Sequence, residues 1–173
     1  MEDKAIEVMK KIDERIKKVA DDKIMYTNKG EKLRKLNSSF NIIIVILSVV
    51  APSLVTYQTQ NTGYPWLVFI SIIIVAISGT TSALRSILRW NERYGFFAMT
   101  GIRLLELESS ASDKKDDIIN TTKDEYIYAK LSQLAMEIQQ QHNKIIQEYL
   151  GNEIKIVEQI NLMQKKENEK ENA

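Results

Sequence analysis

The polar residues that could support chemistry lie inside the least polar part of the chain. They form two sets, each spaced 7 and then 4 residues apart: Asn41, Ser48 and Pro52, and Ser71, Ser78 and Ser82. In a helix this spacing places each set on one face. We favour helix packing, because small residues let helices approach closely and a serine hydroxyl can bond to the carbonyl one turn back. The alternative is a wetted lining formed when several copies assemble, and both hold if the seam between copies borders a pore.

The single histidine, His142, could act as an acid–base group or a pH sensor. A general base needs an orienting partner, and no nucleophile or carboxylate motif accompanies this residue. Three glutamines, Gln139–Gln141, precede it and indicate a polar helix face. We therefore interpret His142 as a half-buried polar residue that fixes the register of a helix seam.

The composition excludes several classes of site. The chain has no cysteine and one histidine, which excludes disulfides, thiolate nucleophiles and a multi-histidine metal site. Its net charge of +1 argues against nucleic-acid binding through bulk charge. The sequence has no phosphate-binding glycine loop and no G-x-S-x-G, H-E-x-x-H or EF-hand pattern. We therefore expect no enzyme activity, no metal or other cofactor, and no nucleic-acid partner.

The distribution of charge along the chain predicts the helices that carry these two sets of residues. Residues 36–84 contain no acidic or basic residue, and they include two apolar runs at about 40–57 and 66–84. Each run would form a helix of about 27–29 Å, close to the hydrocarbon thickness of a bilayer. Strands are usually less than half as long as these runs, which argues against a pair of buried strands. The alternative to a membrane hairpin is the buried core of a soluble protein. We predict an integral membrane hairpin of two helices, with a kink at Pro52.

The stretch Gln58–Pro65 joins the two runs and carries no charge. A potassium-channel filter would need a re-entrant helix as well as this loop, and the stretch is too short for both. We predict an outer turn, in which Pro65 opens the second helix and Tyr57, Tyr64 and Trp66 lie at the membrane interface.

Basic residues indicate the orientation of the hairpin. They precede the first run and follow the second, but the turn has none: Lys29, Lys32, Arg34, Lys35, Arg85, Arg89 and Arg93. The positive-inside rule therefore places both termini in the cytoplasm. We expect Arg85, Arg89, Arg93 and Trp90 to anchor the second helix at the headgroups; a site for an anionic ligand or lipid is the alternative.

The charged segments on either side of the hairpin are predicted to be helical. Residues 1–35 hold an amphipathic helix that breaks near Asn28–Gly30, with Ile12 and Ile16 on its apolar stripe. In residues 85–165 the second span continues to about Glu108, and a polar linker, Ser109–Asp117, follows.

A capping box at Thr122–Glu125 starts the next helix, which Gly151–Asn152 ends or bends. Its seam consists of Ile127, Leu131, Leu134 and Ile138. We expect both cytosolic seams to set an oligomer, and residues 166–173 to form a disordered tail.

This arrangement resembles the SLATT domains, two-span effectors of bacterial conflict systems, and the related DUF4231 proteins. The similarity covers about residues 1–165, and its local part is the stretch RWNERYGFFAMTGIRLLELES, with Trp90, Tyr94 and Leu105 as matching residues. The resemblance implies location in the bacterial inner membrane and assembly of copies. It also implies a membrane permeabilised when a cytosolic sensor, or a nucleotide signal, reports infection.

The fold class expected is therefore all-α: a membrane hairpin with long cytosolic helices in an oligomer. The expected function is a pore or membrane disruption held off until a signal arrives, and the partners are the bilayer and further copies. The rival is a non-conducting scaffold that recruits a soluble partner through its cytosolic helices. A regulatory or lipid-modifying subunit is a third interpretation.

Overall fold

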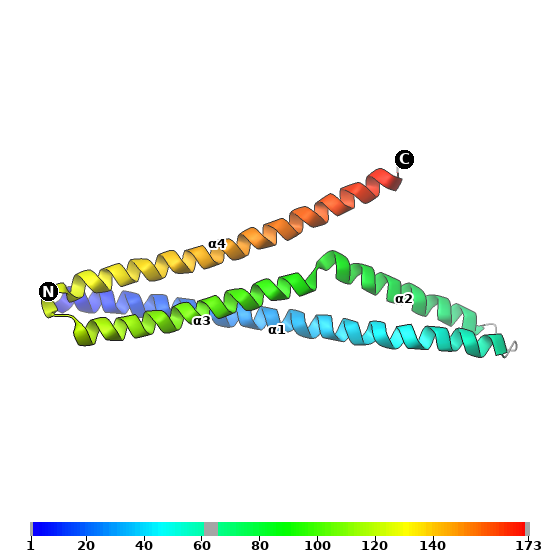
Figure 1. Cartoon of the computed structure of the whole chain (residues 1–173), viewed down its shortest axis with the longest axis horizontal. Helices are drawn as coiled ribbons and strands as arrows, with labels where there is room; N and C mark the ends of the chain where they lie inside the picture. Colours follow the sequence, from blue (N-terminus) through cyan, green and yellow to red (C-terminus); the bar gives the residue numbers. More distant parts are fainter. Residues whose placement is uncertain (1, 61–65, 172–173) are drawn as a thin grey trace. The chain divides into compact units, whose positions relative to one another are not determined.

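The computed structural model describes the backbone of residues 2–60 and 66–171 and shows an all-helical chain. Four helices follow one another: α1 (Glu2–Gln60), α2 (Trp66–Leu88), α3 (Trp90–Thr121) and α4 (Asp124–Glu171) (Figure 1). The prediction of an all-α fold is confirmed for the described residues, where no strand occurs. The turn expected around Tyr64 and Pro65 lies outside them.

Contacts divide the chain into two compact units. Unit 1 comprises Met1–Gly30 and Tyr94–Gln159, and unit 2 comprises Glu31–Arg93 and Ile160–Ala173. Helix α1 therefore supplies its first half to unit 1 and its second half to unit 2.

Unit 1 is a three-helix bundle with a continuous apolar core. Its fully buried side chains come from all three helices: Ile12, Val19, Leu104, Leu131 and Ile138. Helices α1 and α3 approach closely where both carry a small residue, because a Cβ atom on Gly101 would lie 2.9 Å from Oγ1 of Thr27. Glycine at position 101 is therefore what allows this spacing.

The same close approach explains why α1 continues through Asn28–Gly30, where the sequence predicts a break. Gly30 is buried, and a Cβ there would lie 3.2 Å from Cβ of Phe97 on α3. Packing within unit 1 outweighs the low helix propensity of this stretch.

Unit 2 contains the two apolar helices, and most of their large side chains are exposed. Both are long and apolar enough to cross a membrane. In their most apolar stretches only 6% of the residues of α1 and 11% of those of α2 are buried. Helix α1 runs through Pro52, because the backbone on both sides of this residue is helical.

Two further boundaries differ from the sequence predictions, and one agrees. The second apolar helix is not continuous to Glu108, because α2 ends at Leu88 and α3 begins at Trp90. The expected linker Ser109–Asp117 is part of α3, and Ala111 within it is buried in unit 1. Helix α4 begins at Asp124, close to the predicted capping box.

Helix α4 continues without a break past Gly151–Asn152 and ends at Glu171. It therefore includes most of the segment expected as a disordered tail, 166–173, of which residues 172–173 lie outside the described chain.

Candidate functional site

An open groove of about 590 Å³ lies between α1 and α2 within unit 2. Small and hydroxyl-bearing residues form much of its lining: Leu47, Ser48, Ala51, Pro52, Thr56, Val75, Ser78 and Gly79. We call this cavity the hairpin groove. Three of the six residues singled out in the sequence, Ser48, Pro52 and Ser78, line this groove.

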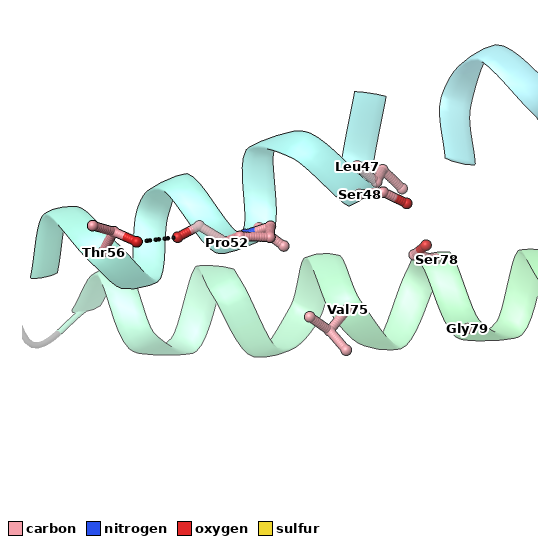
Figure 2. Close-up of a pocket in the computed structure, with 8 residues that line it drawn as sticks. Leu47, Ser48, Pro52, Thr56, Val75, Ser78 and Gly79 are labelled. Atoms are coloured by element: carbon pink, nitrogen blue, oxygen red, sulfur yellow. Dashed lines mark hydrogen bonds between the residues drawn. The ribbon is translucent and has the colours of Figure 1, made fainter. Parts of the chain in front are cut away.

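In the groove, one hydroxyl group of α1 lies before Pro52 and another lies after it. The Ser48 hydroxyl donates to the Ile44 carbonyl at 2.7 Å, and the Thr56 hydroxyl donates to the Pro52 carbonyl at 2.9 Å. Figure 2 shows the latter bond and shows Ser78 pointing toward Ser48 across the groove. Because proline has no N–H, it cannot donate to the Ser48 carbonyl, so this carbonyl is left as an acceptor. The groove is apolar overall, but these oxygen atoms give it a local site for hydrogen bonding.

The other polar residues of the two sets lie elsewhere. Ser71 is buried, and its hydroxyl donates to the Leu67 carbonyl at 2.9 Å, as expected for a packing residue. Asn41 is half-buried, and Ser82 is exposed outside the groove. A helical spacing of 7 and 4 therefore did not identify one common lining.

Thr56 and Gly79 are groove residues that the sequence sets did not contain. Thr56 lies one turn after Pro52, and Gly79 adjoins Ser78. A Cβ added to Gly79 would meet no described atom within 4 Å, so the groove is open at this point. The sequence signals that could have identified them are their positions, one turn after Pro52 and next to Ser78.

A second feature of unit 2 is the elbow, the junction of α2 and α3 at Arg89. Arg89 has a φ of 48°, the left-handed region that residues other than glycine adopt at a cost of about 1–2 kcal/mol. Its carbonyl accepts hydrogen bonds from the N–H groups of Glu92 and Arg93, each at 3.1 Å. Arg89 thus ends one helix and begins the next.

Side chains from α1 hold the start of α3. Asn37 donates from Nδ2 to Oδ1 of Asn91 at 2.7 Å, and the rings of Phe40 and Trp90 lie 4.8 Å apart. We call these two contacts the clasp. On the elbow itself, Arg89 forms an ion pair with Glu92 at 2.5 Å.

These contacts refine the prediction that basic and aromatic residues anchor the second helix. Trp90 is half-buried against Phe40, and Arg89 pairs with Glu92, so both have partners within the chain. Arg93 is half-buried as well, whereas the side chain of Arg85 lies outside the described part of the structure.

In unit 1, His142 is buried in a helix seam and has a carboxylate partner that sequence spacing could not identify. Its Nε2 lies 2.8 Å from Oδ2 of Asp22, 120 residues earlier in the chain. Tyr26 lies one turn further along α1, and its ring stacks edge-on against Tyr149 at 4.9 Å. Burial, and to a lesser degree the Asp22 carboxylate, raises the pKa of Tyr26.

The residues expected to form oligomer seams lie within this bundle. Ile12, Leu131, Leu134 and Ile138 are buried inside a single chain, while Ile16 and Ile127 are half-buried. Their periodicity is accounted for by packing among α1, α3 and α4. The exposed large apolar side chains of unit 1 occupy other faces, for example Met99, Ile102 and Leu105 on α3.

The described side chains contain no group of three His, Asp or Glu residues that could hold a metal ion. A polar groove of about 420 Å³ lies between α3 and α4, with Arg103, Ser110 and Lys144 among its lining residues. The Arg103 guanidinium donates to the carboxylate of Glu148, a bond that lowers the pKa of Glu148 and raises that of Arg103.

One comparison with known proteins gave a match. The model of a family described as a protein of unknown function, DUF4231, matches residues 23–97. This segment includes the hairpin groove, the clasp and the elbow. No curated protein and no solved structure matches the chain.

Proposed function

Because the family that residues 23–97 match, DUF4231, has no known function, we propose a function from the geometry of this segment. The chain is a membrane protein with two spans, and copies assemble through their hairpins to permeabilise the membrane. The hairpin groove borders the path that opens. The SLATT resemblance adds the setting: the bacterial inner membrane, with cytoplasmic termini and activation by a sensor or a nucleotide signal.

The exposure of the apolar helices supports insertion into a membrane. The core helix of a soluble protein buries its apolar face, but Val45, Val49 and Phe69 are 63%, 64% and 69% exposed. Exposed side chains of this kind surround both helices of unit 2. Contact with lipid removes this surface from water, and the apolar run within each helix is about as long as the bilayer core is thick.

The hairpin groove is the observation that supports assembly around a path. Two helices cannot enclose an aqueous path, so several copies must contribute. The small, exposed Gly79 lets a neighbouring helix approach the groove closely. The hydroxyl of Ser78 and the carbonyl of Ser48 then supply polar atoms at the seam between copies.

The test is membrane potential in bacteria that express the protein, measured with a voltage-sensitive dye. We compare the wild type with Ser78→Leu, which fills the groove, and with Ser82→Leu, the same change one turn further on α2 and outside the groove. Genes that neighbour this one are expressed with it, and the bacteria are infected so that the activating signal is present. We expect the wild type and Ser82→Leu to depolarise cells and Ser78→Leu not to do so, at equal amounts in the membrane fraction.

Equal depolarisation by all three proteins would contradict a role of the groove. If none depolarises cells, the pore is excluded and the second candidate applies, a scaffold that recruits a soluble partner. The exposed Met99, Ile102 and Leu105 of unit 1 favour this candidate, because they present apolar surface that the bundle itself does not cover.

A further inference from the structure

The sequence around the elbow lacks the two strongest signals for ending a helix, glycine and proline. No glycine or proline occurs between Gly79 and Gly95, and the apolar periodicity runs on from α2 into α3. A helix normally ends with glycine in the left-handed conformation, whereas this position carries Arg89 with a φ of 48°. The local sequence is therefore compatible with one continuous helix.

Tertiary contacts account for the interruption. The clasp joins Asn91 to Asn37 and Trp90 to Phe40, so the first two residues of α3 are both held by α1. Glu92 accepts two hydrogen bonds from the Arg89 guanidinium, at 2.9 and 2.5 Å. These bonds join residues only three apart, so they can form in a continuous helix as well. The clasp is thus the part that depends on the bent state.

We propose that the elbow at Arg89 is a two-state device. In one state the clasp is closed and Arg89 is left-handed. In the other state the clasp is open, Arg89 is helical, and α2 and α3 form one continuous helix. The first state is the one seen here, and the balance between them is set by opposing local and tertiary preferences.

The local backbone preference and the contacts of the clasp favour different states. Returning Arg89 to helical dihedral angles relieves an unfavourable conformation and completes the backbone bonds of a continuous helix. Opening the clasp loses a ring contact and an amide–amide hydrogen bond. A ligand, lipid or partner that binds one state better shifts the population toward it.

This inference rests on the proposed function for its meaning, because the device would gate the path along the hairpin. Its test does not rest on that function. The chain lacks cysteine, so Ser82→Cys and Ser109→Cys, both at exposed positions, allow two spin labels without other changes. A continuous helix places these backbone positions about 40 Å apart, and an interrupted helix brings them closer.

Pulsed electron paramagnetic resonance on the full-length protein in lipid vesicles measures the two distances. We compare Arg89→Gly, which favours the left-handed conformation and weakens a helix, with Arg89→Ala, which does the reverse. The ratio of long to short distances should be higher in Arg89→Ala by roughly tenfold or more. Trp90→Leu, which removes the ring contact of the clasp, should also raise this ratio. Phe69→Leu, the same kind of change at an exposed aromatic residue of α2, should not.

Identical distance distributions in Arg89→Gly and Arg89→Ala would overturn the proposal. So would a Trp90→Leu distribution that matches Phe69→Leu. The dye measurement on the same variants then separates the two ideas. Distances that shift without any change in depolarisation retain the elbow as a switch and remove its role in a pore.

Discussion

The imidazole of His142 and the carboxylate of Asp22 meet inside unit 1, with Nε2 and Oδ2 2.8 Å apart. The contact joins α4 to α1, and Asp22 lies one helical turn before Tyr26, whose ring packs edge-on against that of Tyr149. Only 6% of the His142 side chain is exposed, so this imidazole nitrogen depends on Asp22 for its hydrogen bond.

His142→Ala should destabilise unit 1 by about 1–3 kcal/mol, because it leaves the Asp22 carboxylate partly buried without this partner. The measurement is thermal unfolding of the purified protein in detergent, followed by helical circular dichroism. Gln140→Ala, at an exposed position on the same helix, is the matched control and should leave Tm unchanged. Equal Tm values for both variants would show that the pair does not stabilise the bundle.

Gly101→Ala should destabilise unit 1 by about 1–3 kcal/mol, since the added Cβ would lie 2.9 Å from Oγ1 of Thr27. Gly151→Ala is the control, because a Cβ there meets no described atom within 4 Å. It should stabilise α4 by about 0.5–1 kcal/mol, through helix propensity. Urea denaturation of each variant measures both changes, and effects of the same sign would refute the close approach.

The ion pair of Glu148 with Arg103 should make stability depend on pH in the acid range. The bond lowers the pKa of Glu148 from its ordinary value of 4.5 in the folded state. As pH falls, the unfolded chain therefore takes up this proton first, so the contribution is present above about 4.5 and is lost below it. Glu148→Gln should flatten the fall of Tm between about pH 5 and 3. Glu158→Gln, at an exposed position on α4, should not, and parallel Tm profiles for the two variants would contradict the assignment.

Val49→Arg should reduce the amount of protein in the membrane fraction, because an arginine at the centre of a span costs about 2.5–3.5 kcal/mol. Val49 is 64% exposed on α1. Ile6→Arg provides the control: Ile6 is 59% exposed on the same helix but belongs to unit 1. Carbonate extraction followed by immunoblotting compares the two, and equal retention would argue that α1 does not insert.

The helical class and the two apolar helices were predictable from the residues alone. A run without charge and longer than any common strand has few alternatives, because backbone hydrogen bonds within a helix need no partner segment. The capping box at Thr122–Glu125 is also a local signal, and it predicted the start of α4 to within two residues.

The contacts that each helical face makes could be learned from the folded chain and not from the sequence. The periodicity of Ile12 and Leu131 indicates a buried stripe, but it does not reveal whether the partner is the same chain or another copy. The structure buries both side chains within one chain. Asp22 and His142 are likewise 120 residues apart, so no spacing rule could pair them.

Tertiary contacts also overrode local preferences in both directions. Gly30 remains helical because α1 packs against Phe97 there, and Arg89 leaves the helical conformation where the clasp holds Trp90 and Asn91. In each case the local preference is about 1–2 kcal/mol, which contacts with a distant segment can exceed. Local sequence therefore indicated most of the helical segments, and packing between helices decided where one helix continues and another ends.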